Sequence, residues 1–110
     1  MNADLRTACD HLRGVIERAR TLEQRQHAAQ FRTAVDLLSA PNPLDRVYLR
    51  MSTTEADIRR ALTVAANRYG SHPALLVLEI HRWHNRSRSQ RWAARAALGE
   101  LNKQPAFRRP

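Results

Sequence analysis

Arginine and tryptophan side chains gather between residues 82 and 95 of the 110-residue chain. Arginine binds phosphate through paired hydrogen bonds and stacks on flat rings. An exposed tryptophan can stack on an unpaired base or insert at a groove of a duplex. This combination predicts a nucleic-acid-binding surface. Its candidate residues, with two further arginines near the C-terminus, are Arg82, Trp83, Arg86, Arg88, Arg91, Trp92, Arg95, Arg108 and Arg109.

The two tryptophans of this group have a competing use in the core. The chain contains only two Trp, two Tyr and two Phe, so a small core has few large side chains to draw on. We therefore expect Trp83 and Trp92 to be buried. The arginines have no such alternative, because a guanidinium group is almost never fully buried without a partner.

Histidine and carboxylate side chains within residues 72–84 form a second group, whose side chains are of the types that bind metal ions. His81 and His84 would share a face if this segment were helical, and His72 and Glu79 lie close to them in sequence. No set of four ligands has the spacing of a known metal site. We predict no metal and no cofactor.

Catalysis would require a nucleophile beside a base and an orienting group. Cys9 and His11 are two residues apart, and side chains at that spacing diverge on a helix. The acidic residues are scattered, and three glycines are too few for a glycine-rich phosphate loop. The single cysteine also excludes an internal disulfide. The sequence therefore predicts a protein with no catalytic residues.

Positive charge is concentrated at the C-terminal end. Residues 1–40 contain six Arg against five acidic residues, and residues 41–80 contain five Arg against four. Residues 81–110 contain seven Arg and one Lys against Glu100 alone, which is +7 of the net +9. Such asymmetry favours a polyanionic partner, most often nucleic acid. A solvated basic face that aids solubility is the alternative.

Two helices are expected at the N-terminal end. Apolar residues recur at three- and four-residue steps over roughly 3–20, where Asn2 or Asp4 can cap the start. A second, out-of-phase stripe predicts a helix over 22–39, and residues 21–24 have the spacing of a capping box. We expect a helical hairpin. One long helix with two contact faces, which would favour a homodimer, is the alternative.

A strand–helix–strand unit is expected next. Pro41 and Pro43 end the hairpin, since proline cannot continue a helix. Residues 46–51 alternate charged and apolar side chains, which indicates a short strand. Helical spacing then predicts a helix at about 53–69. The apolar run 74–80 fits either a buried strand or a buried helix, and we favour the strand.

This arrangement has a counterpart in a known family. Leu49-Arg50 before the predicted helix and the Gly-Ser-His-Pro turn at 70–73 resemble a strand–helix–strand segment near the C-terminus of bacterial replicative DNA polymerase alpha subunits. The matching segment contains no catalytic residue. The resemblance implies a local fold and no function.

A basic helix is expected to follow. Ser87 or Ser89 can cap a helix from about 90 to 102. Residues 104–110 form a basic tail. The arginines of the helix would lie opposite its apolar face, which consists of Ala94, Ala97, Leu98 and Leu101.

The sequence as a whole predicts a mainly helical α+β domain over residues 1–103. Residues 1–40 form the hairpin, and residues 44–103 form the strand–helix–strand unit and the basic helix. An all-α bundle is the alternative fold. No stretch approaches ~20 apolar residues and no basic-then-apolar leader is present, so we expect a cytoplasmic protein with no membrane partner.

The expected function is that of a non-catalytic nucleic-acid-binding accessory or regulatory protein, with DNA favoured over RNA. The alternative is an adaptor or inhibitor that docks its basic face on an acidic partner protein. A homodimer formed through the N-terminal helices is compatible with either function.

Overall fold

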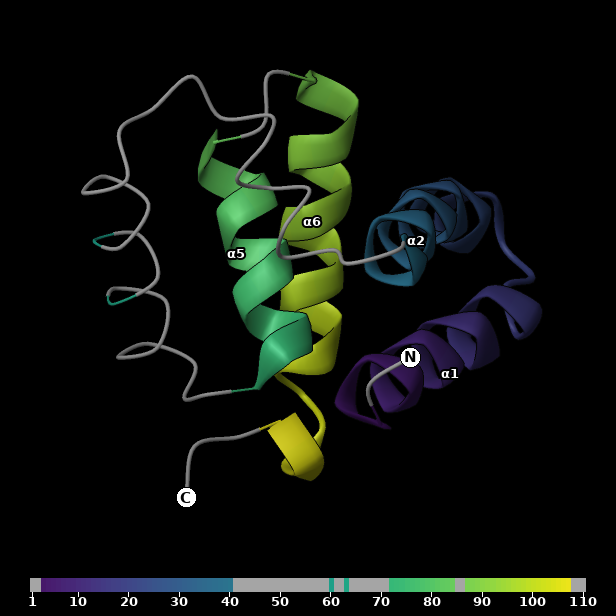
Figure 1. Ribbon diagram of the computed structural model, residues 1–110. Coiled ribbons are helices and arrows are strands. Elements are labelled where there is room, and N and C mark those ends of the chain that lie inside the picture. Colours follow the sequence, from purple (N-terminus) through teal and green to yellow (C-terminus); the bar gives the residue numbers. More distant parts are fainter. Residues whose placement is uncertain (1–2, 41–59, 61–62, 64–71, 85–86, 108–110) are drawn as a thin grey trace.

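Helices account for nearly all of the residues that the structure describes. The computed structural model describes residues 3–40, 60, 63, 72–84 and 87–107 (Figure 1). Its elements are the α-helices α1 (Ala3–Glu17), α2 (Leu22–Ser39), α5 (Pro73–His84) and α6 (Arg88–Leu101), and the 3-10 helix η1 (Pro105–Phe107).

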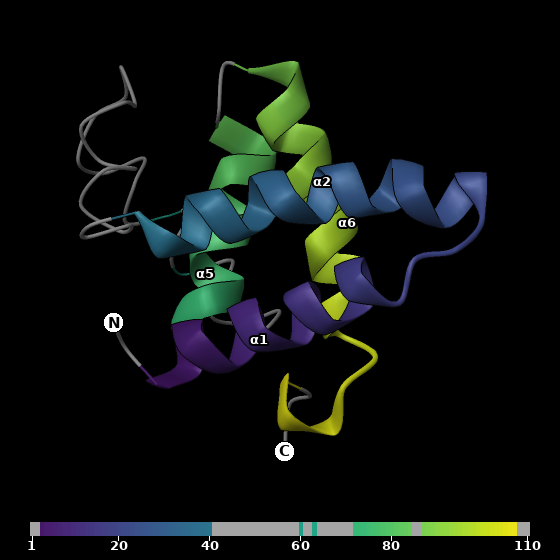
Figure 2. The same cartoon turned by 90° about the vertical axis from the view of Figure 1, so that its right-hand side faces the viewer.

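The four α-helices form two hairpins that pack on each other. Helix α1 lies beside α2, α5 lies beside α6, and α2 crosses α6 (Figure 2). The predicted N-terminal hairpin is confirmed, and the single long helix is wrong. The local cause is the predicted capping box. The Thr21 hydroxyl accepts from the Gln24 N–H at 3.1 Å, and the Gln24 side chain accepts from the Thr21 N–H at 3.1 Å.

The strand expected at 74–80 is wrong, because this segment is the body of α5. Pro73 begins the helix, a position where its fixed φ and missing N–H are tolerated. Helix α5 is buried on nearly every side, so its sequence lacks the polar stripe that usually marks a helix. The all-α alternative fits, and no strand occurs among the described residues.

Most of the rest of the expected strand–helix–strand unit lies outside the described residues. Arg60 and Thr63 are helical, and the rest of the helix predicted at 53–69 lies outside the described residues. So does the strand predicted at 46–51.

The start of α5 is held by a side chain from α1. The Asp4 carboxylate accepts from the Ala74 backbone N–H at 2.9 Å, and it also lies 3.3 Å from His72 Nδ1. The sequence predicted Asn2 or Asp4 as the cap of α1. Asn2 lies outside the described residues, and Asp4 lies in the first turn of α1. The Asp4 carboxylate also satisfies a first-turn N–H of α5, where a helix leaves its donors unpaired and a negative charge is favoured.

All four helices contribute to one core. Each helix contributes one or two leucines that have 2% or less of their surface exposed. These leucines are Leu12, Leu38, Leu75, Leu78, Leu98 and Leu101. Phe107 of η1 is also buried and packs edge-on against His72, so the segment predicted as a basic tail supplies a core side chain. No helix in the described ranges is long and apolar enough to cross a membrane.

Candidate functional site

Helix α6 presents the arginines in the way that its sequence pattern predicts. Ser87 caps the helix, because its hydroxyl accepts from the Gln90 N–H at 3.3 Å. One side of α6 is buried in the core through Ala93, Ala94, Ala97, Leu98 and Leu101. The opposite side is exposed and carries four of the predicted site residues, which we call the α6 surface: Arg88, Arg91, Trp92 and Arg95.

Both tryptophans are exposed, so the expectation that they are buried is wrong. Trp83 is 59% exposed and Trp92 is 56% exposed. The core is filled by leucines, and α6 packs against its neighbours through alanines, which brings the helices close and leaves no space for an indole ring. Each ring instead lies beneath an arginine. Arg82 Cζ is 4.8 Å from the centroid of Trp83, and Arg88 Cζ is 5.8 Å from that of Trp92.

Trp83 and Arg82 are tied to a buried carboxyl group. Glu79 is only 3% exposed. Its side chain accepts a hydrogen bond from the Trp83 indole N–H, and it lies 3.8 Å from Arg82 Nη1. A buried carboxyl group needs such partners to offset the loss of water. This pair of predicted site residues therefore serves the fold.

Three of the predicted site residues belong to neither of these groups. Arg86, Arg108 and Arg109 are outside the described residues. Of the nine candidates, four are thus brought together on α6 and two are held by Glu79.

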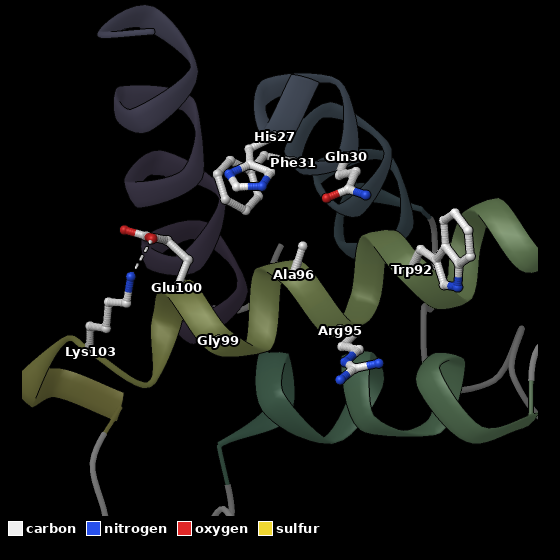
Figure 3. Close-up of a pocket in the computed structure, with 9 residues that line it drawn as sticks. All are labelled: His27, Gln30, Phe31, Trp92, Arg95, Ala96, Gly99, Glu100 and Lys103. Atoms are coloured by element: carbon white, nitrogen blue, oxygen red, sulfur yellow. Dashed lines mark ion pairs between the residues drawn. The ribbon is translucent and has the colours of Figure 1, made fainter. Parts of the chain in front are cut away.

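A groove of about 450 Å³ separates part of α2 from α6 (Figure 3). Trp92 stands at one end, and the ion pair of Glu100 and Lys103 stands at the other. Arg95 lies on the α6 side and points away from α2. The lining residues are His27, Gln30, Phe31, Trp92, Arg95, Ala96, Gly99, Glu100 and Lys103.

The charges around the groove leave it with a positive rim. The one carboxylate in its lining, that of Glu100, is 3.6 Å from Lys103 Nζ and 3.4 Å from His11 Nε2. Within the described ranges, no acidic side chain pairs with Arg91 or Arg95. An anion that approaches this side of α6 therefore meets two arginines that no carboxylate of the described residues neutralises.

Sequence reasoning missed the α2 wall of this groove. His27, Gln30 and Phe31 face α6 only because α2 crosses it, and no local pattern encodes that crossing. The one available signal was Gly99, because a glycine inside a strongly periodic helix is unfavourable relative to alanine and leaves a gap in the row of side chains.

His72, His81 and Cys9, which belonged to the predicted metal-binding and catalytic candidates, do not line the groove. His81 is buried, and His72 contacts Asp4 and Phe107. Cys9 is buried with its Sγ 3.6 Å from the Ser39 hydroxyl. Across the described part of the chain, no three His, Cys, Asp or Glu side chains are grouped so that they could hold a metal ion.

Comparison with known protein families, curated proteins and solved structures finds no match for this chain. An exposed indole, unneutralised arginines and a groove with an amide in its wall suit a flat, anionic ligand better than a neutral or cationic one.

Proposed function

We propose that the protein binds nucleic acid through the α6 surface and acts as an accessory or regulatory factor without catalysis. The observation that carries this proposal is the exposure of Trp92 among three exposed arginines, Arg88, Arg91 and Arg95. Neither Arg91 nor Arg95 is matched by a carboxylate from the described residues.

The affinity for nucleic acid comes mainly from phosphate contacts. Each phosphate neutralised by an arginine releases condensed counterions, so affinity falls with salt. The +7 charge of residues 81–110 provides the long-range attraction. Arg82 and Trp83 contribute less than their positions in the sequence suggest, because Glu79 already engages both.

Fluorescence anisotropy of labelled single- and double-stranded DNA and RNA tests the proposal. The titrations use nuclease-treated protein at several salt concentrations. On duplex DNA, a slope of about −4 in log K against log salt corresponds to roughly four phosphate contacts. Absence of binding to every nucleic acid at low salt would contradict the proposal.

Charge reversal then locates the site. The triple variant R88E/R91E/R95E should lose at least about 100-fold in affinity at moderate salt, because it replaces phosphate contacts by repulsion. Its helical content should be unchanged, since all three side chains are exposed. The matched control is R6E/R25E/R32E, which changes the net charge equally on α1 and α2. Equal losses in both variants would show that only net charge matters.

The second candidate is docking on an acidic protein. The favouring observation is Trp92 beneath Arg88, because tryptophan and arginine dominate the energetics of protein interfaces. This function would use the same α6 surface, and failure of all nucleic acids to bind would favour it. The homodimer stays a prediction, and the apolar stripes of α1 and α2 are already used in the core of one chain.

A further inference from the structure

We infer that the groove between α2 and α6 holds one unpaired nucleobase, so that the protein prefers single-stranded to duplex nucleic acid. This inference rests on the proposed function and adds the class of ligand. It follows from the shape of the groove, from the side chains in its walls and from the arginines at its edge.

The groove is large enough for a base and offers a surface on which to stack. Its volume of about 450 Å³ lies within the range of roughly 300–1,000 Å³ that is typical of small-molecule sites. Trp92 borders it with more than half of the side chain accessible. Stacking on an aromatic ring is the usual way in which proteins hold unpaired bases, and it tolerates any base.

The α2 wall adds a polar contact between two aromatic ones. Figure 3 shows the Gln30 amide on this wall, between Phe31 and Trp92. An amide both donates and accepts hydrogen bonds, so it can pair with the edge of a base. His27 and Phe31 form a tilted ring pair with centroids 6.5 Å apart, so the wall also carries aromatic surface beside the amide.

The arginines are placed for the backbone of the same strand. Arg95 borders the groove but points away from α2, so its guanidinium group is not in competition with a base for the interior. Arg88 and Arg91 continue the exposed side of α6 beyond Trp92. A strand could therefore put one base into the groove while its phosphates follow α6. A duplex cannot do this without breaking a base pair.

Gly99 provides a way to close the groove without disturbing the fold. A Cβ atom built at Gly99 meets nothing within 4 Å, and leucine is a good helix former. The variant Gly99→Leu should therefore fold and occupy the groove. The control is Ala29→Leu, an exposed position on α2 that lies about 160° around the helix from His27 and Phe31.

The measurement compares three probes of one length: an oligothymidine, an abasic strand with the same phosphates, and a duplex. The wild-type protein should bind oligothymidine about tenfold more tightly than the abasic strand, which is the gain from one stacked base. Gly99→Leu should remove this preference and leave the affinity for the abasic strand unchanged. Ala29→Leu should behave as wild type, and the duplex should bind more weakly than oligothymidine.

The outcomes that would contradict the base-binding groove differ from the outcome that would contradict nucleic-acid binding. Equal binding of oligothymidine and the abasic strand by the wild-type protein would overturn the base-binding groove and leave nucleic-acid binding standing. A preference that survives in Gly99→Leu would also overturn it, because the base would then lie elsewhere. Binding of none of the three probes would overturn the proposed function itself.

Discussion

Helices α5 and α6 form one hairpin, and each carries an exposed tryptophan beneath an arginine, yet the two tryptophans have different surroundings. The indole N–H of Trp83 is bonded to the buried Glu79. Trp92 makes no hydrogen bond to any described residue, and its ring borders an open groove. The two tryptophans are therefore similarly exposed but differ in role: Trp83 stabilises the fold, whereas Trp92 is free to contact a ligand.

The difference follows from how each helix is buried. Helix α5 is enclosed on nearly every side, and the polar side chains Glu79 and His81 are enclosed with it. Such groups require partners, and Trp83 and Arg82 supply them for Glu79. Helix α6 buries only its alanine and leucine side, so its arginines and Trp92 are not needed by the core. An arginine over an exposed ring is thus not enough to identify a binding residue.

The largest expected effect that separates the two helices is on nucleic-acid affinity. Trp92→Ala should weaken binding of a single-stranded oligonucleotide by about 1–3 kcal/mol, the usual contribution of a stacked base, and leave the melting temperature nearly unchanged. Trp83→Ala should leave the affinity of the folded protein nearly unchanged. Anisotropy titrations below the melting temperature check both. A larger loss of affinity for Trp83→Ala would reverse the roles that the comparison assigns.

The next effect is on the free energy of unfolding, and here substitution of Trp83 should matter more than substitution of Trp92. Trp83→Phe keeps an aromatic ring but removes the donor to Glu79, so it should lower the free energy of unfolding by about 1–3 kcal/mol. Trp92→Phe should change it by less than about 0.5 kcal/mol, as for most surface substitutions. Urea denaturation measures both variants. Similar values for the two would mean that the Glu79 contact contributes nothing to the fold.

The same contrast separates what the sequence predicted from what it did not. The capping box at Thr21 was predicted, and Ser87 was one of the two predicted caps of α6, because a cap involves residues only three apart. The arginine side of α6 was predicted, because a half-buried helix displays its period in its sequence. Helix α5 was missed because a helix buried all round has no such period, and the choice between strand and helix is then made by its neighbours.

Long-range packing accounts for the remaining errors. Whether Trp83 and Trp92 enter the core depends on which other side chains fill it, and leucines from all four helices do so. The groove needs His27 and Phe31 opposite Gly99, a pairing created by the crossing of α2 over α6. Asp4 meets Ala74 across 70 positions of sequence. No local pattern encodes any of these three contacts.

A smaller effect on stability is expected from the first turns of α5 and α6, which are capped in different ways. Helix α6 is capped by its neighbour Ser87, whereas the first turn of α5 is served by Asp4 of α1. Asp4→Ala should cost about 1 kcal/mol of stability, as loss of a capping side chain does. Asp10→Ala is the control, because Asp10 is exposed on the same helix and its ion pair with Arg13 is on the surface. Thermal unfolding that is equally affected by both would show that the contact between α1 and α5 is dispensable.

The smallest effect tests whether the space beside α6 is as open as the groove requires. Glycine inside a helix is less favourable than alanine by roughly 0.5–1 kcal/mol, and a methyl group at Gly99 meets nothing within 4 Å beyond its chain neighbours and the backbone of its own helix. Gly99→Ala should therefore raise the free energy of unfolding by up to about that amount, less if the last turn of α6 frays. The comparison is Gly14→Ala in α1, where the new Cβ would lie 3.1 Å from Arg18 Nη1 and the arginine would have to move. A destabilised Gly99→Ala would mean that the surface over α6 is already occupied by protein, and the groove would then have no room for a base.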